Sequence, residues 1–157
     1  MGLGRFGLRG VAVILLLLGG CAKGDPLTGA AIDAAEARWR ANPLAAYRMH
    51  LEISGDLIQE GEFVIEVRDG EVASVTGNGE TITTRDDFYT VDGLFTMLRQ
   101  ELEMATQPHL FWQPPKDARI YQRAHFDAQT GYCRRYLRSV TGTQHNIVIK
   151  VTALEPL

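Results

Sequence analysis

The sequence has little cysteine, with Cys21 and Cys133 the two examples in 157 residues. Two cysteines cannot build the disulfide framework that stabilises many small secreted domains. Zinc-binding spacings such as Cys-x-x-Cys and His-x-x-x-His are also missing, and the histidines are scattered at His50, His109, His125 and His145. We therefore expect no metal site and no cofactor.

Motifs for catalysis and nucleotide binding are absent as well. The chain has no Gly-x-Ser-x-Gly nucleophile elbow, no phosphate-binding loop and no dinucleotide fingerprint. The adjacent acids Asp86 and Asp87 lie in a Thr-rich segment, where a solvated turn is expected rather than a pair of catalytic carboxylates. No convergent set of catalytic groups is visible, so we expect that the protein is not an enzyme.

An excess of positive charge is missing too. The chain has 16 Lys and Arg against 19 Asp and Glu, which argues against nucleic acid as a partner. The charge is unevenly placed: residues 52–103 hold 13 acids and three bases, whereas residues 116–150 hold seven bases and two acids. We expect these segments to lie side by side in one sheet, with charges paired across strands. The alternative is an acidic face for a cationic partner.

The longest apolar run is too short for a spanning helix. Residues 11–18 read Val-Ala-Val-Ile-Leu-Leu-Leu-Leu, whereas a spanning helix needs about 20 apolar residues. The preceding segment contains Arg5 and Arg9 and no acid. A short positive segment followed by a short apolar one is typical of a signal peptide. The alternatives are an uncleaved membrane helix and an ordinary secretory signal.

The apolar run ends in Leu18-Gly19-Gly20-Cys21, which resembles the lipobox of bacterial lipoproteins. The resemblance implies cleavage before Cys21 and acylation of that residue, so that residues 1–20 form a lipoprotein signal peptide. Several acyl chains make such an anchor effectively permanent. Because Ala22 rather than an acid follows Cys21, enteric-type sorting rules imply the outer membrane, facing the periplasm. Membrane lipid is then the first expected partner, and an envelope protein the second.

The rest of the chain predicts a single α+β domain. We expect residues 21–28 to be a lipidated tether and residues 29–157 to be the domain. Apolar spacing predicts helices over residues 29–41 and 90–103. Period-2 alternation and turn signals predict strands at 47–54, 62–68, 72–76, 119–126, 132–140 and 146–154. The expected architecture is an antiparallel sheet of about six strands with two helices packed on one face.

Several short sequence motifs occur along the chain in a characteristic order. They are Trp39, the strand that begins at Tyr47, and the segments 67–72, 90–95 and 126–132. In this order they resemble the small secreted and lipid-anchored bacterial proteins of domain-of-unknown-function family 6174, over about residues 36–154. The resemblance implies a location in the cell envelope and an α+β fold, with no assigned activity.

Cys133 is the first candidate for chemistry. If Cys21 is acylated, Cys133 has no intramolecular partner, and a lone thiol in an oxidising compartment should be buried. Alternation along the strand places it with Arg135 and Leu137, which leaves its exposure open. The competing hypothesis is a thiol-dependent enzyme centred on Cys133, with His125 or His145 as the base. A cluster of arginines would then lower the pKa of the thiol: Arg134, Arg135 and Arg138.

The second candidate is the aromatic pair Phe111 and Trp112, which lies in a loop with two prolines. These side chains either tuck under the sheet edge or anchor a partner. Our leading hypothesis is a membrane-anchored envelope lipoprotein with a non-catalytic interaction domain. The alternatives are an inhibitor or modulator of another envelope protein, using this loop as a plug, and the thiol-dependent enzyme.

Overall fold

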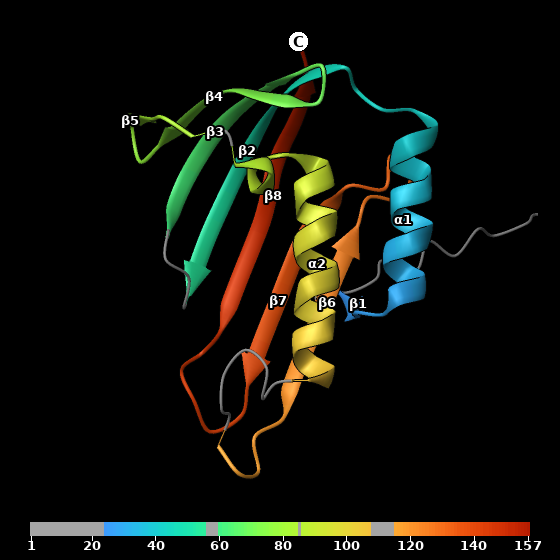
Figure 1. Cartoon of the computed structure of the whole chain (residues 1–157), viewed down its shortest axis with the longest axis vertical. Coiled ribbons are helices and arrows are strands. Elements are labelled where there is room, and N and C mark those ends of the chain that lie inside the picture. The colour runs from blue at the N-terminus through green and yellow to red at the C-terminus, as the bar shows by residue number, and fades with distance from the viewer. Residues whose placement is uncertain (1–23, 56–59, 85, 108–114) are drawn as a thin grey trace, which may run out of the picture.

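The computed structural model describes residues 24–55, 60–84, 86–107 and 115–157. Two helices, α1 (Gly29–Ala41) and α2 (Val91–Thr106), lie in front of one antiparallel sheet (Figure 1). A short 3-10 helix, η1 (Asp87–Tyr89), precedes α2. The strands are β1 (Asp25–Pro26), β2 (Ala46–Gly55), β3 (Gly61–Arg68), β4 (Glu71–Gly77), β5 (Glu80–Ile82), β6 (Ile120–Phe126), β7 (Cys133–Val140) and β8 (Ile147–Pro156).

The spatial order of the strands is β1-β6-β7-β8-β2-β3-β4-β5, and every neighbouring pair is antiparallel. The predicted α+β class, the antiparallel sheet and the two helices are confirmed. The sheet has eight strands rather than about six, so the predicted number is wrong. The two additional strands, β1 and β5, contain two and three residues. Strands this short show no alternation that a sequence pattern could detect.

β1 extends the domain into the segment expected to be a tether. Its two residues pair with Arg123 and Ala124 of β6. The next residue, Leu27, is buried in the core, and its backbone N–H donates to the carbonyl oxygen of Gln122 at 3.0 Å. Asp25–Leu27 therefore belongs to the folded domain, which begins before residue 29.

The alternating residues of the strands form the core as expected. On β2, the side chains of Tyr47, Met49, Leu51 and Ile53 are all buried. The β3–β4 hairpin turns at Asp69-Gly70, whose φ angles are 53° and 80°. Two successive positive φ angles make the turn type that matches the twist of a hairpin.

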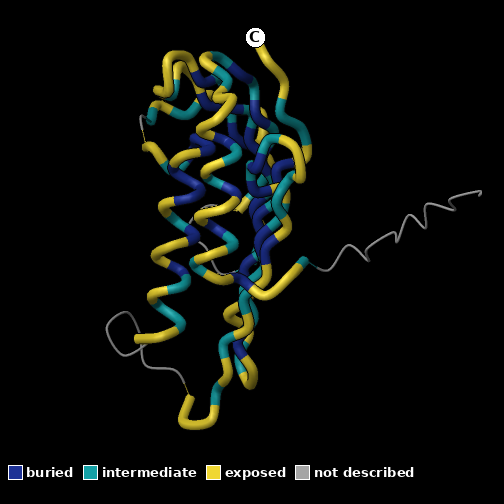
Figure 2. The backbone as a smooth tube through the Cα atoms, turned by 90° about the vertical axis from the view of Figure 1, so that its right-hand side faces the viewer, coloured by how far each residue is buried: buried dark blue, intermediate teal, exposed yellow. Residues whose placement is uncertain are grey.

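Both helices bury one side against the sheet. In α1 the buried residues are Ile32, Ala35 and Trp39, and in α2 they include Val91, Leu94, Phe95 and Leu98. Thr28 and Thr90 cap the two helices, each accepting a hydrogen bond from a backbone N–H in the first turn. In the side view of Figure 2, the helices form one layer and the sheet the other. Among the described residues no helix covers the second side of the sheet, which we call the open face.

Candidate functional site

Cys133 lies at the start of β7, on the helix-covered side of the sheet, and is 5% exposed. The expectation that it is buried is confirmed. Burial raises the pKa of the Cys133 thiol to about 12, and a hydrogen bond from the backbone of Arg135 offsets this only in part. The thiol is therefore protonated at neutral pH, so the expectation that nearby arginines lower its pKa is wrong.

A β-bulge separates Cys133 from Arg135. In the β6–β7 ladder, Phe126 pairs with Cys133 and His125 pairs with Arg135, so Arg134 is an extra residue. The bulge shifts the alternation by one residue, which puts Arg135 on the open face although it lies two positions after Cys133. His125, beside Phe126, also falls on the open face. Strand alternation through the bulge therefore separates Cys133 from this proposed base.

The other members of the proposed thiol site are dispersed. His145 follows the far end of β7, and the seven residue steps from Cys133 to Val140 already span about 23 Å. Arg134 lies 3.9 Å from Asp127 in the β6–β7 connection. Arg138 pairs with a carboxylate on α2. The structure does not bring these groups together around the thiol.

Because Cys133 is buried and protonated, we expect it to react slowly in the folded protein. In a Cys21→Ser variant, where Cys133 is the single remaining thiol, labelling at neutral pH should be about a hundredfold slower than in denaturant. Thiol titration with a chromogenic disulfide measures both rates. Labelling of the folded variant at the denatured rate would contradict the burial of this residue.

Several signature residues meet at the first turn of α2. The rings of Trp39 and Tyr47 pack edge to face, with centroids 5.8 Å apart and an interplanar angle of 88°. The Tyr47 hydroxyl accepts the backbone N–H of Val91 at 2.9 Å, and Nε1 of Trp39 donates to Oδ2 of Asp92 at 3.4 Å. Burial raises the pKa of Tyr47 to about 12. These residues fix the start of α2 and thus have a structural role.

The neighbouring acids Asp86 and Asp87 are exposed. The Asp86 side chain accepts the backbone N–H of Phe88 at 2.9 Å and so caps η1. A Cβ added at Gly93 would lie 1.6 Å from the carbonyl oxygen of Asp87, so η1 packs directly on α2 at a position that requires glycine. The expected solvated turn is confirmed.

A buried polar cluster lies where α2 crosses β6 and β7. Nη1 of Arg138 donates to both carboxylate oxygens of Glu101, at 2.9 and 3.1 Å, and the Tyr136 hydroxyl donates to the same carboxylate at 2.8 Å. The side chains of Arg138 and Glu101 are 12% and 9% exposed. Nε2 of Gln122 donates to the Glu101 backbone carbonyl and to the Tyr136 hydroxyl. Burial, and next the charge of Glu101, raises the pKa of Tyr136.

Although this cluster contains an acid, a phenol and an arginine, most of its polar groups bind one another, and Nε of Arg138 is buried without a hydrogen-bond partner. It joins α2 to the sheet from the interior, and none of the described pockets is lined by its residues. The sequence reasoning missed it, because Glu101 and Arg138 are 37 positions apart. Its role is therefore to hold the helix layer on the sheet.

The open face carries a row of ionisable side chains that crosses five strands. Cross-strand pairing places these residues next to one another in the order His125, Arg135, Lys150, Glu52, Glu62. Neighbouring strands lie about 4.8 Å apart, so the row is about 19 Å long. We call it the charged row. Its first three residues are His, Arg and Lys, which form the basic half, and its last two are Glu, which form the acidic half.

Two of the pairs in the charged row have like charges. Arg135 lies directly opposite Lys150, and Glu52 lies directly opposite Glu62. Like charges at directly opposed positions destabilise a sheet. Between these pairs, Nζ of Lys150 binds a carboxylate oxygen of Glu52 at 2.7 Å. The two charged segments of the sequence do meet across strands, as expected, but they retain unfavourable pairs on either side of the junction.

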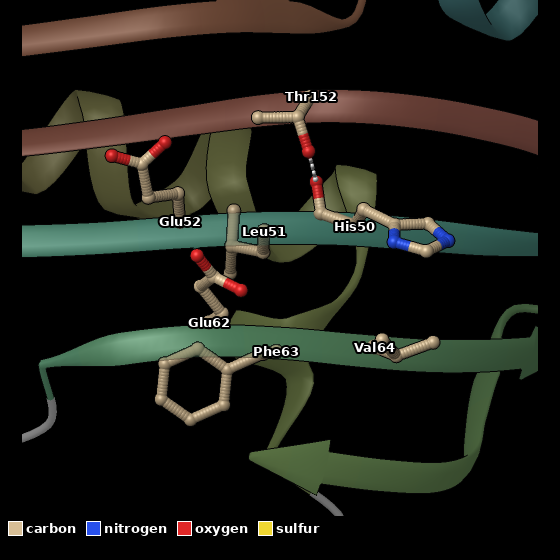
Figure 3. Close-up of a pocket in the computed structure, with 7 residues that line it drawn as sticks. All are labelled: His50, Leu51, Glu52, Glu62, Phe63, Val64 and Thr152. Carbon is tan, nitrogen blue, oxygen red and sulfur yellow. Dashed lines mark hydrogen bonds between the residues drawn. The ribbon is translucent and has the colours of Figure 1, made fainter. Parts of the chain in front are cut away.

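The acidic half of the row borders a shallow depression of about 170 Å³ (Figure 3). Glu52 and Glu62 come from adjacent strands, and His50 is two residues from Glu52 on β2. The Thr152 hydroxyl donates to the backbone carbonyl of His50 at 3.4 Å, where β8 contains an extra residue. Within the described ranges, no group of three or more His, Cys, Asp or Glu side chains is arranged to hold a metal ion.

Three residues singled out from the sequence, Cys21, Phe111 and Trp112, lie outside the described residues. In the part of the chain that is described, none of the helices combines the length and apolar character that crossing a membrane requires.

The fold defines the class of protein: an α+β domain with two helices on one side of an eight-stranded antiparallel sheet and an open face on the other. A family model described as "Family of unknown function (DUF6174)" matches residues 31–114, more than half of the chain. The protein therefore belongs to this family, as the ordered signatures predicted. The match begins inside α1, includes α2 and stops before β6, so it is shorter than the expected span of about 36–154. The comparisons with curated proteins and with solved structures found no match.

Proposed function

We propose that this protein is a membrane-anchored envelope lipoprotein whose domain binds a partner protein through the open face of its sheet. The proposal combines an anchor, inferred from the lipobox at Leu18–Cys21, with a binding surface, inferred from the charged row. The row is the observation that carries the binding role.

The unfavourable pairs in the charged row support a binding role. Arg135 beside Lys150, and Glu52 beside Glu62, place like charges at directly opposed positions, an arrangement that is unfavourable in a sheet. The Lys150–Glu52 ion pair joins one member of each pair. A partner with the opposite arrangement of charges would relieve both pairs at once. Charge complementarity of this kind speeds association and selects the correct partner. The domain is therefore proposed to recognise a surface with an acidic patch beside a basic one.

The anchor is consistent with the position of the folded domain. β1 begins at Asp25, four residues after Cys21. Four residues span at most about 14 Å, so acyl chains on Cys21 would hold the domain close to the bilayer surface. Such a short connection would restrict the partner to proteins in or near the same membrane.

Substitution of Cys21 tests the anchor. We expect a Cys21→Ser variant to leave the membrane fraction, because the sulfur that takes up the first acyl chains is missing. Fractionation and intact-mass analysis of the unsubstituted chain should show a membrane-bound product that begins at an acylated Cys21. An unmodified cysteine, or a mature product that begins elsewhere, would contradict the anchor.

Charge reversal at Glu62 tests the binding surface. Glu62 is exposed at the acidic end of the row, so Glu62→Lys should weaken partner capture from solubilised membranes about tenfold or more. The matched control is Glu103→Lys, which makes the same charge change at an exposed position of α2. Quantitative mass spectrometry of the captured proteins measures the effect. Equal capture by both variants and the unsubstituted protein would exclude the charged row as the binding surface.

A further inference from the structure

A second hollow is lined by residues of α1, β1 and the end of β6. Figure 1 shows where these three elements lie. The volume of the hollow is about 420 Å³, and we call it the α1 pocket. Most of its lining is apolar and small, including Ala31, Ala34, Ala124 and Ala128. The ionisable residues that line it are Asp25, Arg38 and His125. A hollow with apolar walls and a few polar groups is typical of a small-molecule site.

Arg38 is the unusual residue of this pocket. Its Nε atom is shielded from solvent and has no hydrogen-bond partner, and its guanidinium forms no hydrogen bond or ion pair with the described residues. Asp25 lines the same pocket, but no ion pair joins it to Arg38. By contrast Arg40, two residues further along α1, is exposed and binds Glu36 at 2.5 Å. The terminal N–H groups of Arg38 are not shielded in this way and have no partner among the described residues, so they are available to an anion in the pocket.

The β6–β7 turn holds Arg38 in this position. Gly131 packs so closely on α1 that an added Cβ would lie 3.0 Å from the Cβ of Arg38 and 2.1 Å from the carbonyl oxygen of Ala35. The turn is itself fixed by Asp127, whose carboxylate accepts the backbone N–H groups of Gln129 and Thr130. The base of the Arg38 side chain is thus enclosed by a rigid part of the fold, next to the hollow.

We propose that the α1 pocket binds an organic anion, with a carboxylate or phosphate group on Arg38 and an apolar group against the alanine walls. A guanidinium presents its N–H groups as a planar fork that matches both anions. The four alanines, together with Pro26 and Phe126, offer an apolar surface to the rest of the ligand. Two sources supply this chemistry: a free carboxylic acid with an alkyl chain, and the phosphate end of a membrane lipid. The pocket shares His125 with the charged row, and its other lining residues lie outside the row.

Calorimetric titration of the full chain in a non-ionic detergent tests the proposal, with hexanoate, hexyl phosphate and uncharged hexanol as probes. We expect at least one of the two anions to bind more tightly than hexanol. Arg38→Gln, which removes the charge and keeps the stem, should weaken that binding about tenfold or more. Tighter binding of hexyl phosphate points to a lipid phosphate, and tighter binding of hexanoate points to a free acid.

Two further variants separate binding from folding. Arg40→Gln makes the same change on the same helix outside the pocket, and should bind like the unsubstituted protein. Ala34→Leu introduces a good helix former at an exposed position that lines the pocket, and should weaken binding by filling it. Three results would overturn the proposal. Hexanol could bind as tightly as the anions, Arg38→Gln and Arg40→Gln could lose equal affinity for the anions, or neither anion could bind.

Discussion

Replacing Glu101 with alanine is expected to lower the free energy of unfolding by about 3–5 kcal/mol, because the change leaves a buried arginine without its counter-charge. In the native protein, Arg138 donates to both carboxylate oxygens of Glu101, and both side chains are almost fully enclosed. The Tyr136 hydroxyl loses its acceptor in the same substitution. Chemical denaturation, followed by far-UV circular dichroism, measures the effect.

Glu103→Ala is the matched control for this prediction. Glu103 lies two residues further along α2 and is exposed, so its loss should change stability by about 0.5 kcal/mol or less. Replacing both members of the pair, as in Glu101→Leu with Arg138→Met, should recover much of the loss, because no unpaired charge is then buried. A loss under 1 kcal/mol in Glu101→Ala would show that this pair does not hold α2 on the sheet.

Gly131→Ala is expected to cost about 2–5 kcal/mol of stability, for two separate reasons. Gly131 has a φ angle of +87°, which an L-residue with a side chain adopts only at a cost of about 1–2 kcal/mol. The added Cβ would also lie 2.1 Å from the carbonyl oxygen of Ala35, so α1 or the turn would have to move. Thermal and chemical denaturation both report the change.

Gly142→Ala isolates the first of these two costs. Gly142 has a similar φ angle of +74°, but nothing lies within 4 Å of its added Cβ. This variant should therefore lose about 1–2 kcal/mol, from backbone conformation alone. The difference between the two variants measures how tightly the β6–β7 turn packs on α1. Equal losses at the two positions would mean that this packing contributes nothing.

Much of the fold could be predicted because most elements are long and strongly patterned. The alternation from Tyr47 to Ile53 and the apolar spacing from Val91 to Leu98 each extend over at least two periods, and the structure follows both. The first helix was predicted at its observed bounds, Gly29–Ala41. The edge strands were missed because pairing with a neighbour, and not a pattern of their own, creates β1 and β5.

The candidate sites were harder to predict, because they depend on registers and contacts between distant segments. Simple alternation puts Cys133 and Arg135 on one side, whereas the bulge at Arg134 puts them on opposite sides. The charged row requires the strand order, which joins β8 to β2 across 98 positions at Lys150 and Glu52. The charge segregation along the chain was nevertheless a real signal, since the row is made from those two segments.

The packing of the helices on one side of the sheet explains why like-charge pairs are tolerated on the other side. The interior cluster around Glu101 and the packing of Trp39 on Tyr47 hold the helices firmly on one side. A sheet stabilised from that side can tolerate unfavourable pairs on the other, where each costs only about 0.2–1 kcal/mol. Such a sheet leaves the open face available for the binding role proposed above.

In-cell photo-crosslinking tests most directly whether this face binds a partner. A photoreactive residue would replace Ser54, which is exposed at the end of β2 beside the charged row, and in a second strain Glu103, which is exposed on α2. We predict a crosslinked protein from position 54 that is weak or missing from position 103. Crosslinks from position 103 alone, or from neither position, would contradict the assignment of the open face as the binding surface.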